Sequence, residues 1–325
     1  MSLDASASAT TLSGIDPRSL RLMQRHASNR QAREAAQRRA RLLDHLATAV
    51  MLVLVGFLVV VLVIVVGAIL IQGVPQLSWA FITTSSSLTQ PGGGVGPQLW
   101  CTLYLMVLSL LLTVPVGIAA AIYLEEMARP SRFTEAVGFS VEALSSVPSI
   151  VFGTFGAAVF LLGMGFGYSI LSGALTLTLL NLPLVVRVGQ EALRSVPREY
   201  REASQALAAQ PLETIRKLVL PTALPGIITA VVLTAGRVIG ETAPLILTMG
   251  TSISPNAQYS LNPLATGETL AVHIWVLKVA GVPGLKDADA VANGSAALLL
   301  IIVLVLSLSA TFFTIRSNQR LRGLR

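Results

Sequence analysis

The feature that most constrains this chain is an uninterrupted run, residues 47–71, that contains no charged side chain. An α-helix rises about 1.5 Å per residue, so roughly 20 apolar residues cross the hydrocarbon core of a bilayer. The run exceeds the roughly 7–15 apolar residues of a signal-peptide core and lacks a small-residue cleavage site. We therefore expect residues 47–72 to form a first transmembrane helix.

Five further segments have the same apolar character. The chain is 53% hydrophobic and 12% charged, with a mean hydropathy of +0.73, which is typical of an integral membrane protein. Pro148 lies within one of these segments and removes a helix hydrogen bond, so we expect that span inside the bundle. A shorter stretch, 270–279, is expected as a helix at the membrane surface. The predicted fold is all-α with six transmembrane helices, the last five at 100–124, 141–164, 170–186, 225–248 and 296–313.

The basic residues predict the orientation of these helices. Of 23 Lys and Arg residues, 20 fall in segments on the side of the N-terminus, Lys278 and Lys286 fall on the other side, and Arg237 falls inside a span. Because Lys and Arg collect in cytoplasmic loops, both termini are predicted to be cytoplasmic. Residues 1–46 are expected to be a basic, largely disordered extension that becomes helical near the membrane, and residues 316–325 a cytoplasmic tail.

Composition also excludes several kinds of chemistry. The net charge of +7 is explained by membrane topology, so no nucleic-acid partner is expected. Cys101 is the single cysteine and the three histidines are widely separated, which argues against a disulfide and a metal site. The sequence contains no Walker motif, so the chain is not expected to hydrolyse ATP. We therefore predict a non-catalytic protein without a cofactor of its own.

The segment 187–221 carries most of the charge between two predicted spans. Pro197 and Pro211 suit the first turns of helices, where a missing N–H costs nothing, so the spacing predicts two short helices with a bend between them. Pro221 and Pro225 are expected to end the second helix and to redirect the chain into the fifth span. Periodicity alone is equally consistent with a structured loop and with a docking element.

Two charged side chains lie within the fifth predicted span. Arg237 and Glu241 are four residues apart, so on a helix they share a face and can form an ion pair. A charged side chain near the bilayer centre costs roughly 2.5–3.5 kcal/mol on the insertion scale, so such a pair faces the bundle interior or water. The pair is consistent with a substrate pathway and with a buried contact that only fixes helix packing.

The segment 187–221 also carries a recognisable pattern. Glu202-Ala203-Ser204, followed by alanines up to Ala209 and by Leu218-Val219-Leu220-Pro221, resembles the EAA loop of ABC-importer permeases. The resemblance implies that this segment inserts into a groove on a separate ATPase subunit. Ala208 stands where the family usually has Gly, so Pro211 is an alternative source of the bend. The residues that the resemblance assigns to ATPase coupling are Glu202, Ala203, Ser204, Ala208, Leu218 and Pro221.

The resemblance narrows to one subfamily. Four runs, 102–126, 145–153, 182–187 and 236–248, are similar to the A-type permease of phosphate-specific (Pst) ABC importers. The resemblance covers about residues 97–315 and implies the fold of a type I ABC importer permease in the bacterial cytoplasmic (inner) membrane. It implies import of inorganic phosphate by an assembly with a second, homologous C-type permease, an ATPase dimer that binds ATP and Mg²⁺, and an extracytoplasmic phosphate-binding protein.

This resemblance also suggests residues for the substrate pathway. Arg237 is expected to offer phosphate a cationic contact with several donors, while Glu241 holds the guanidinium and competes for it afterwards. Thr242 belongs to the same motif. Arg187 is expected either to aid exit of the anion or to extend toward an interface, and Ser149 either to donate to substrate or to bond its own helix backbone.

Other functions fit the same sequence features. The same architecture could carry another oxyanion, such as sulfate or phosphonate. An ion-coupled secondary transporter should show twin interrupted spans in two halves, and no such internal repeat is visible. A membrane sensor or scaffold could use residues 187–217 to dock a regulator without transport.

Overall fold

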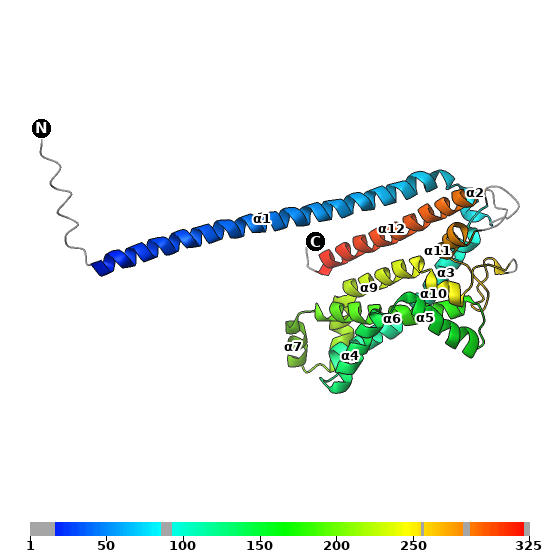
Figure 1. Ribbon diagram of the computed structural model, residues 1–325. Coiled ribbons are helices and arrows are strands. Elements are labelled where there is room, and N and C mark those ends of the chain that lie inside the picture. Colours follow the sequence, from blue (N-terminus) through cyan, green and yellow to red (C-terminus); the bar gives the residue numbers. More distant parts are fainter. Residues whose placement is uncertain (1–16, 86–92, 255–256, 282–286, 322–325) are drawn as a thin grey trace. The chain divides into compact units, whose positions relative to one another are not determined.

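The structure is a computed structural model that describes residues 17–85, 93–254, 257–281 and 287–321. Every regular element in these ranges is a helix, which confirms the all-α prediction (Figure 1). The chain divides into two units, residues 1–67 and residues 68–325.

The first unit contains most of α1, a helix over Pro17–Gly73 whose last residues belong to the second unit. The portion Asp44–Gln76 is long and apolar enough to cross a membrane, in agreement with the predicted first span. The extension was expected to be disordered first and helical near the membrane, and its described part is helical from Pro17 onward. Neither Gly nor Pro occurs in residues 18–46, and Ala, Arg, Gln and Leu there favour a helix. Residues 1–16 lie outside the described part of the chain.

The second unit is a bundle of long helices joined by short ones. Three helices, α5, α8 and α11, each run directly into a π-helical turn, and another π-helical turn follows α3 over Tyr123–Met127. The helices after α1 are α2 (Trp79–Thr83), α3 (Gly96–Ile122), α4 (Arg132–Ser145), α5 (Ser149–Gly156), α6 (Ile170–Arg194), α7 (Arg198–Ala206), α8 (Pro211–Thr214), α9 (Leu220–Gly240), α10 (Ala243–Thr248), α11 (Leu270–Trp275) and α12 (Ala288–Leu321).

Five of the described helical segments are long and apolar enough to cross a membrane on their own. A sixth crossing exists if the bent pair formed by α4 and α5 counts as one span. The single segments are Asp44–Gln76, Gly96–Met127, Ile170–Arg194, Pro211–Gly240 and Ala288–Phe312. The number and the approximate positions of the apolar segments thus agree with the sequence prediction, whereas the third and fifth differ from it in shape.

The third predicted span consists of two helices. α4 and the helical segment that begins with α5 meet at an angle of 101°. Pro148 stands immediately before α5 with ψ of 141°, so it precedes a helix and removes no hydrogen bond from a helix interior. α5 packs against α6 and α10, but no residue of α4 is buried. The predicted single helix with an interior proline is thus a bent pair, in which α4 contacts α6 without burying a residue and α5 is packed between α6 and α10.

The fifth span begins earlier than predicted. The backbone stays helical from Pro211 to Gly240, so Pro221 and Pro225 do not end the helix that begins at Pro211. A π-helical turn over Ile215–Val219 precedes the first of these prolines, and local π-helical adjustments of this kind allow prolines within membrane helices. The second half of the segment 187–221 and the fifth span therefore share one helical backbone.

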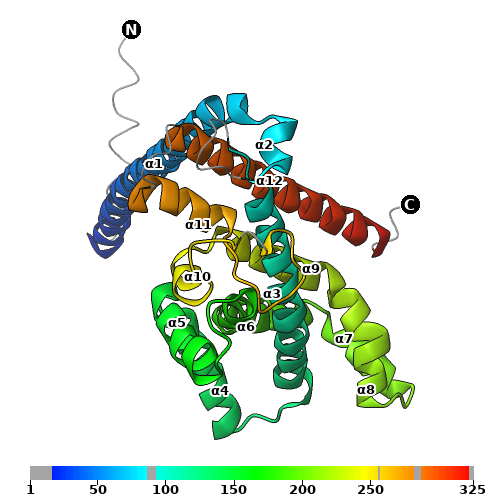
Figure 2. The same cartoon turned by 90° about the vertical axis from the view of Figure 1, so that its right-hand side faces the viewer.

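The packed core of the second unit lies around α3, α6 and α9 (Figure 2). Gly117 of α3 packs on Val185 of α6, and Gly226 of α9 packs on Ala192 of α6, where an added Cβ would overlap its neighbour. The small residues let the three helices approach closely. α12 runs beside α9 (Figure 1).

The short helix predicted at the membrane surface is present, and its first half is buried. α11 and its π-helical turn end at Ala280, and Leu270, Val272 and His273 of this helix are buried. Val272 joins the apolar core around α3 and α6, and Leu270 joins a second apolar cluster with α2 and α12. Protein thus covers the first half of this helix, whereas Trp275 and Val279 in its second half are exposed, and the position at the membrane surface stays a prediction.

Candidate functional site

The bend in the segment 187–221 is a helix C-terminal motif after α7. Ala208 has φ of 58°, in the left-handed region, the N–H of Ala208 donates to the carbonyl of Gln205, and the N–H of Ala209 donates to the carbonyl of Ser204. This pair of bonds is a Schellman motif, which satisfies the last carbonyls of a helix and reverses the chain. Ala208 thus takes the backbone conformation that a glycine would take there, and Pro211 begins the next helix.

The two arms of the bend are tied together by hydroxyl groups. The Oγ of Ser204 lies 2.8 Å from the Oγ1 of Thr214, which joins α7 to α8. Leu218 and Pro221, the last two positions of the EAA-like pattern, lie on the continuous helix that follows. The pattern is therefore a compact hairpin of helices rather than a loose loop.

The outer surface of this hairpin offers side chains to a partner. Leu207 at the bend is 84% exposed, and Leu212 and Tyr200 are also largely exposed. Glu202 and Ala203 are exposed as well, and within the described residues the Glu202 carboxylate has no hydrogen-bond or ion-pair partner. Exposed apolar side chains grouped with an unpaired charge are typical of a protein interaction site.

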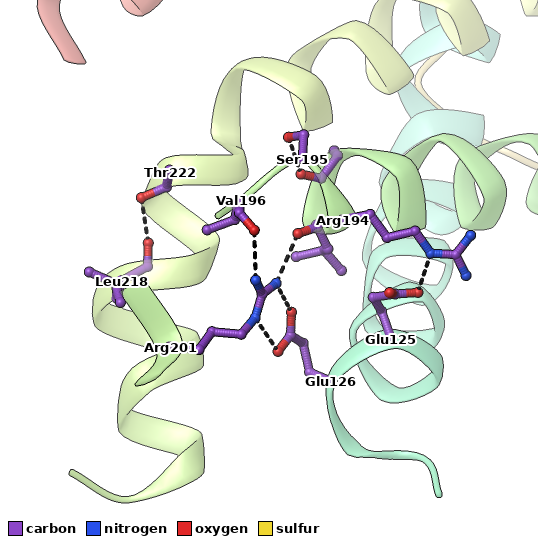
Figure 3. Close-up of polar contacts among 10 residues, drawn as sticks. Glu125, Glu126, Arg194, Ser195, Val196, Arg201, Leu218 and Thr222 are labelled. Atoms are coloured by element: carbon purple, nitrogen blue, oxygen red, sulfur yellow. Dashed lines mark hydrogen bonds and ion pairs between the residues drawn. The ribbon is translucent and has the colours of Figure 1, made fainter. Parts of the chain in front are cut away.

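A polar cluster lies between this hairpin and the ends of two long helices (Figure 3). Arg201 of α7 forms an ion pair with Glu126, which follows α3, and Arg194 of α6 forms one with Glu125. Side chains of this cluster line a cavity of about 590 Å³. The sequence analysis missed these pairs, although two adjacent carboxylates at a membrane end where basic residues are expected were a usable signal.

The charged pair predicted in the fifth span is present. The Nε of Arg237 lies 3.2 Å from Oε1 of Glu241, and the two side chains are 38% and 15% exposed. The geometry differs from the prediction, because α9 ends at Gly240 and Glu241 is an extended residue just beyond it. A break in the helix thus places a carboxylate and the following peptide groups beside the guanidinium.

The other predicted pathway residues are dispersed. Thr242 lies in the break before α10, where its carbonyl accepts the N–H groups of Leu245 and Ile246. Ser149 begins α5, a helix that packs against α10, and within the described residues its hydroxyl has no hydrogen-bond partner. Arg187 is exposed and lies within α6, which continues to Arg194 and so extends beyond the predicted end of the fourth span. No contact joins it to the Arg237–Glu241 pair.

A buried polar cluster at the start of α3 was also missed. The carboxylate of Glu268 accepts from Nε2 of Gln98 at 3.1 Å and lies 3.2 Å from Nδ1 of His273. All three side chains are buried. Gln98 and Glu268 are 170 positions apart in sequence, so no local pattern brings these two together, whereas Glu268 and His273 are only five positions apart.

Comparison with known proteins places this arrangement in a family. Residues 113–323 match the family described as "Binding-protein-dependent transport system inner membrane component". A relative from Bacillus subtilis (strain 168), named probable ABC transporter permease protein YqgI, is 41% identical over 276 residues, which cover 82% of this chain and 93% of the relative. Phosphate transport system permease protein PstA 1 of Mycobacterium tuberculosis (strain CDC 1551 / Oshkosh) is 42% identical over 167 residues. That match covers 51% of this chain and 55% of that relative.

Solved structures agree on the fold. The inward-facing MetNI methionine ABC transporter aligns with a TM-score of 0.54 at 20% identity, over 68% of this chain and 94% of that chain. A bacterial alginate ABC transporter aligns with a TM-score of 0.52 at 17% identity, over 68% and 78%. The chain therefore belongs to the binding-protein-dependent transport system inner membrane components, the non-catalytic transmembrane permease subunits of ABC transporters.

Proposed function

We propose that this chain is the permease subunit of an ATP-driven importer that carries inorganic phosphate across the cytoplasmic membrane. The observation that carries the proposal is the Arg237–Glu241 ion pair at the break between α9 and α10. An intramembrane charged pair marks a substrate or ion pathway by default. The phosphate-transport name of a relative with 42% identity supports the choice of substrate.

The chemistry of the pair suits a transient anion contact. The guanidinium of Arg237 has five N–H donors, and its hydrogen bond to Glu241 uses only Nε–H, which leaves donors for phosphate oxygens. Glu241 then recovers the guanidinium, so the anion is released rather than held. The hydroxyls of Thr242 and Ser149 add neutral donors from the break and from the start of α5. Arg187 attracts the anion toward the cytoplasmic end of α6.

The hairpin of α7 and α8 is the contact with the ATPase in this proposal. Exposed Leu207 and Leu212 supply apolar area, and unpaired Glu202 supplies a charge for a basic partner group. An ATPase dimer below the membrane, a second homologous permease beside this chain and an extracytoplasmic phosphate-binding protein complete the transporter. Closure of the dimer moves the hairpin, and the shared helix carries that movement to Arg237.

Uptake in a reconstituted complex tests the function. Proteoliposomes that contain this chain, the second permease and the ATPase, with binding protein added, should accumulate radiolabelled phosphate only when ATP is supplied. Excess unlabelled phosphate should compete, whereas sulfate and phosphonates should not. Competition by sulfate would assign another oxyanion. Uptake without the ATPase would indicate a secondary transporter, and phosphate binding without uptake would indicate a sensor.

Arg237→Gln should reduce phosphate uptake by about tenfold or more, because a charge-assisted hydrogen bond contributes roughly 1.5–3 kcal/mol. The matched control is the double variant with Glu241→Gln, which removes both charges and leaves a neutral pair. A pair that only fixes packing would regain uptake in the double variant. If Arg237 instead contacts phosphate, the double variant should stay impaired in uptake. Recovery of uptake would therefore overturn the proposed role of Arg237.

A further inference from the structure

Arg201 makes more hydrogen bonds than any other charged side chain in the described part of the chain. Its Nε and Nη2 donate to the two oxygens of Glu126 at 3.1 and 2.6 Å. Its Nη1 donates to the carbonyl of Val196 at 2.7 Å, and Nη2 also donates to the carbonyl of Leu193 at 2.9 Å. Figure 3 shows the guanidinium between Glu126 and these carbonyls. One side chain of α7 therefore binds both the end of α6 and the turn after α3.

The chemistry of this contact favours a fixed geometry. A planar guanidinium matches a carboxylate with two parallel bonds, which a lysine ammonium cannot reproduce. The carbonyls of Leu193 and Val196 lie at the C-terminal end of α6, where the helix dipole favours a cation. The side chains of Arg201 and Glu126 are only 21% and 9% exposed. The hydrogen bonds that Arg201 donates to the Glu126 carboxylate raise the pKa of the guanidinium, so it stays charged.

A neighbouring ion pair provides the contrast. Arg194 donates one hydrogen bond to Glu125, and the Arg194 side chain is 65% exposed. It joins the same two helices, α6 and α3, without involving α7. An exposed ion pair of this kind contributes little to the stability of the fold, because solvent screens the attraction between its charges.

We propose that Arg201 is a positioning residue that fastens the coupling helix to α3 through Glu126. α7 is already connected to the fifth span through the bend and the shared helix from Pro211. The contact with Glu126 adds a second connection, to a helix that packs on both α6 and α9. Movement of α7 by the ATPase then displaces α3 together with α9. This inference rests on the proposed coupling role of α7.

The first test measures coupling in the reconstituted complex. Arg201→Lys keeps the positive charge but loses the two parallel hydrogen bonds to Glu126. Arg201→Gln loses the charge as well as these bonds. Each should lower the phosphate imported per ATP hydrolysed by about tenfold or more, while complex assembly and basal ATP hydrolysis stay at wild-type levels. The charge exchange Arg201→Glu with Glu126→Arg should restore part of the ratio. Arg194→Gln is the matched control and should leave the ratio unchanged.

The second test reports on position directly. In a Cys101→Ser background, spin labels at Gln205 of α7 and at Arg129 after α3 measure the distance between the two elements. The distance should be the same in nucleotide-free and ATP-bound wild-type complexes, because the elements move together. In Arg201→Gln it should match the wild type without nucleotide and lengthen or shorten with ATP. An unchanged distance in that variant, or an unchanged import ratio, would overturn the proposal. Absence of phosphate uptake by the wild type would instead refute the proposed function.

Discussion

A buried carboxylate, Glu268, joins the connection before α11 to the first turn of α3. It bonds Gln98 and His273, and all three side chains are buried. Two atoms of the cluster, Oε1 of Gln98 and Nε2 of His273, have no partner among the described residues. Buried polar groups without hydrogen-bond partners destabilise the folded protein. Glu268 is the residue that both Gln98 and His273 contact, so the hydrogen bonds of this cluster depend on it.

Glu268→Ala should therefore destabilise the protein strongly. A buried group left without its hydrogen bond typically costs about 1–3 kcal/mol, and here Nε2 of Gln98 and Nδ1 of His273 both lose their bond. Thermal unfolding in detergent would measure the effect as a lower midpoint. Asp289→Ala is the control, since the 86% exposed Asp289 side chain pairs only with Lys278 at the surface, and its midpoint should stay at the wild-type value. Equal midpoints for the two variants would show that the buried cluster is not stabilising.

Sequence reasoning reaches single residues only where their neighbours in sequence decide the outcome. The Arg237–Glu241 pair was predictable, because four residues separate the two charges in an apolar segment. The Gln98–Glu268 and Glu126–Arg201 contacts were not, because the two residues of each pair lie on elements that are distant in sequence. Such pairs depend on how the helices pack, which periodicity does not determine.

Among the elements, the hairpin of α7 and α8 shows how a local conformation replaces an expected residue. The family-like pattern has Ala208 where Gly is usual, and the structure keeps the left-handed conformation at this position with φ of 58°. For residues other than glycine this conformation costs roughly 1–2 kcal/mol. The hydrogen bonds of the bend and the Ser204–Thr214 contact maintain it.

Ala208→Gly should consequently stabilise the protein by roughly 0.5 kcal/mol, because relief of the backbone strain exceeds the roughly 0.5–1 kcal/mol of added chain entropy. Ala209→Gly is the matched control: Ala209 does not have a positive φ, so only the entropy term applies and stability should fall. Unfolding midpoints of the two variants, measured side by side, should shift in opposite directions. A lower midpoint for Ala208→Gly would contradict the assignment of strain to this residue.

Among the helices, the long apolar segments were predictable from the sequence, but the positions where they bend or continue through a proline were not. Hydropathy identified the regions that form α3, α6, α9 and α12, because burial in a bilayer requires an apolar run. The effect of each proline depended on its surroundings. Pro148 precedes a helix at a bend of 101°, whereas Pro221 lies within a continuous helix after a π-helical turn. Neither outcome follows from the proline alone.

For the whole molecule, the bent pair of α4 and α5 decides the topology. If the pair crosses the membrane once, the chain has six crossings and its charged segments share one side. If it returns to the side from which it entered, α6 would place Arg198 and the hairpin of α7 and α8 on the side opposite Arg129. The distribution of 23 basic residues, 20 of them on one predicted side, supports six crossings.

Cysteine accessibility in intact cells would test this topology. In a Cys101→Ser background, Leu261→Cys should react with a membrane-impermeant maleimide, because Leu261 is exposed on the predicted outer side. Arg198→Cys should react only after the cells are permeabilised. Labelling of Arg198→Cys in intact cells would mean that the α4–α5 pair is a re-entrant loop.

The Schellman motif after α7 has a consequence for assembly of the transporter. Because the bend satisfies its own backbone carbonyls, the hairpin needs no partner in order to fold. The proposed docking surface is therefore preorganised, and association with an ATPase avoids the ordering cost that a disordered segment incurs on binding. Subunits of this kind can separate and rejoin without refolding at their contact.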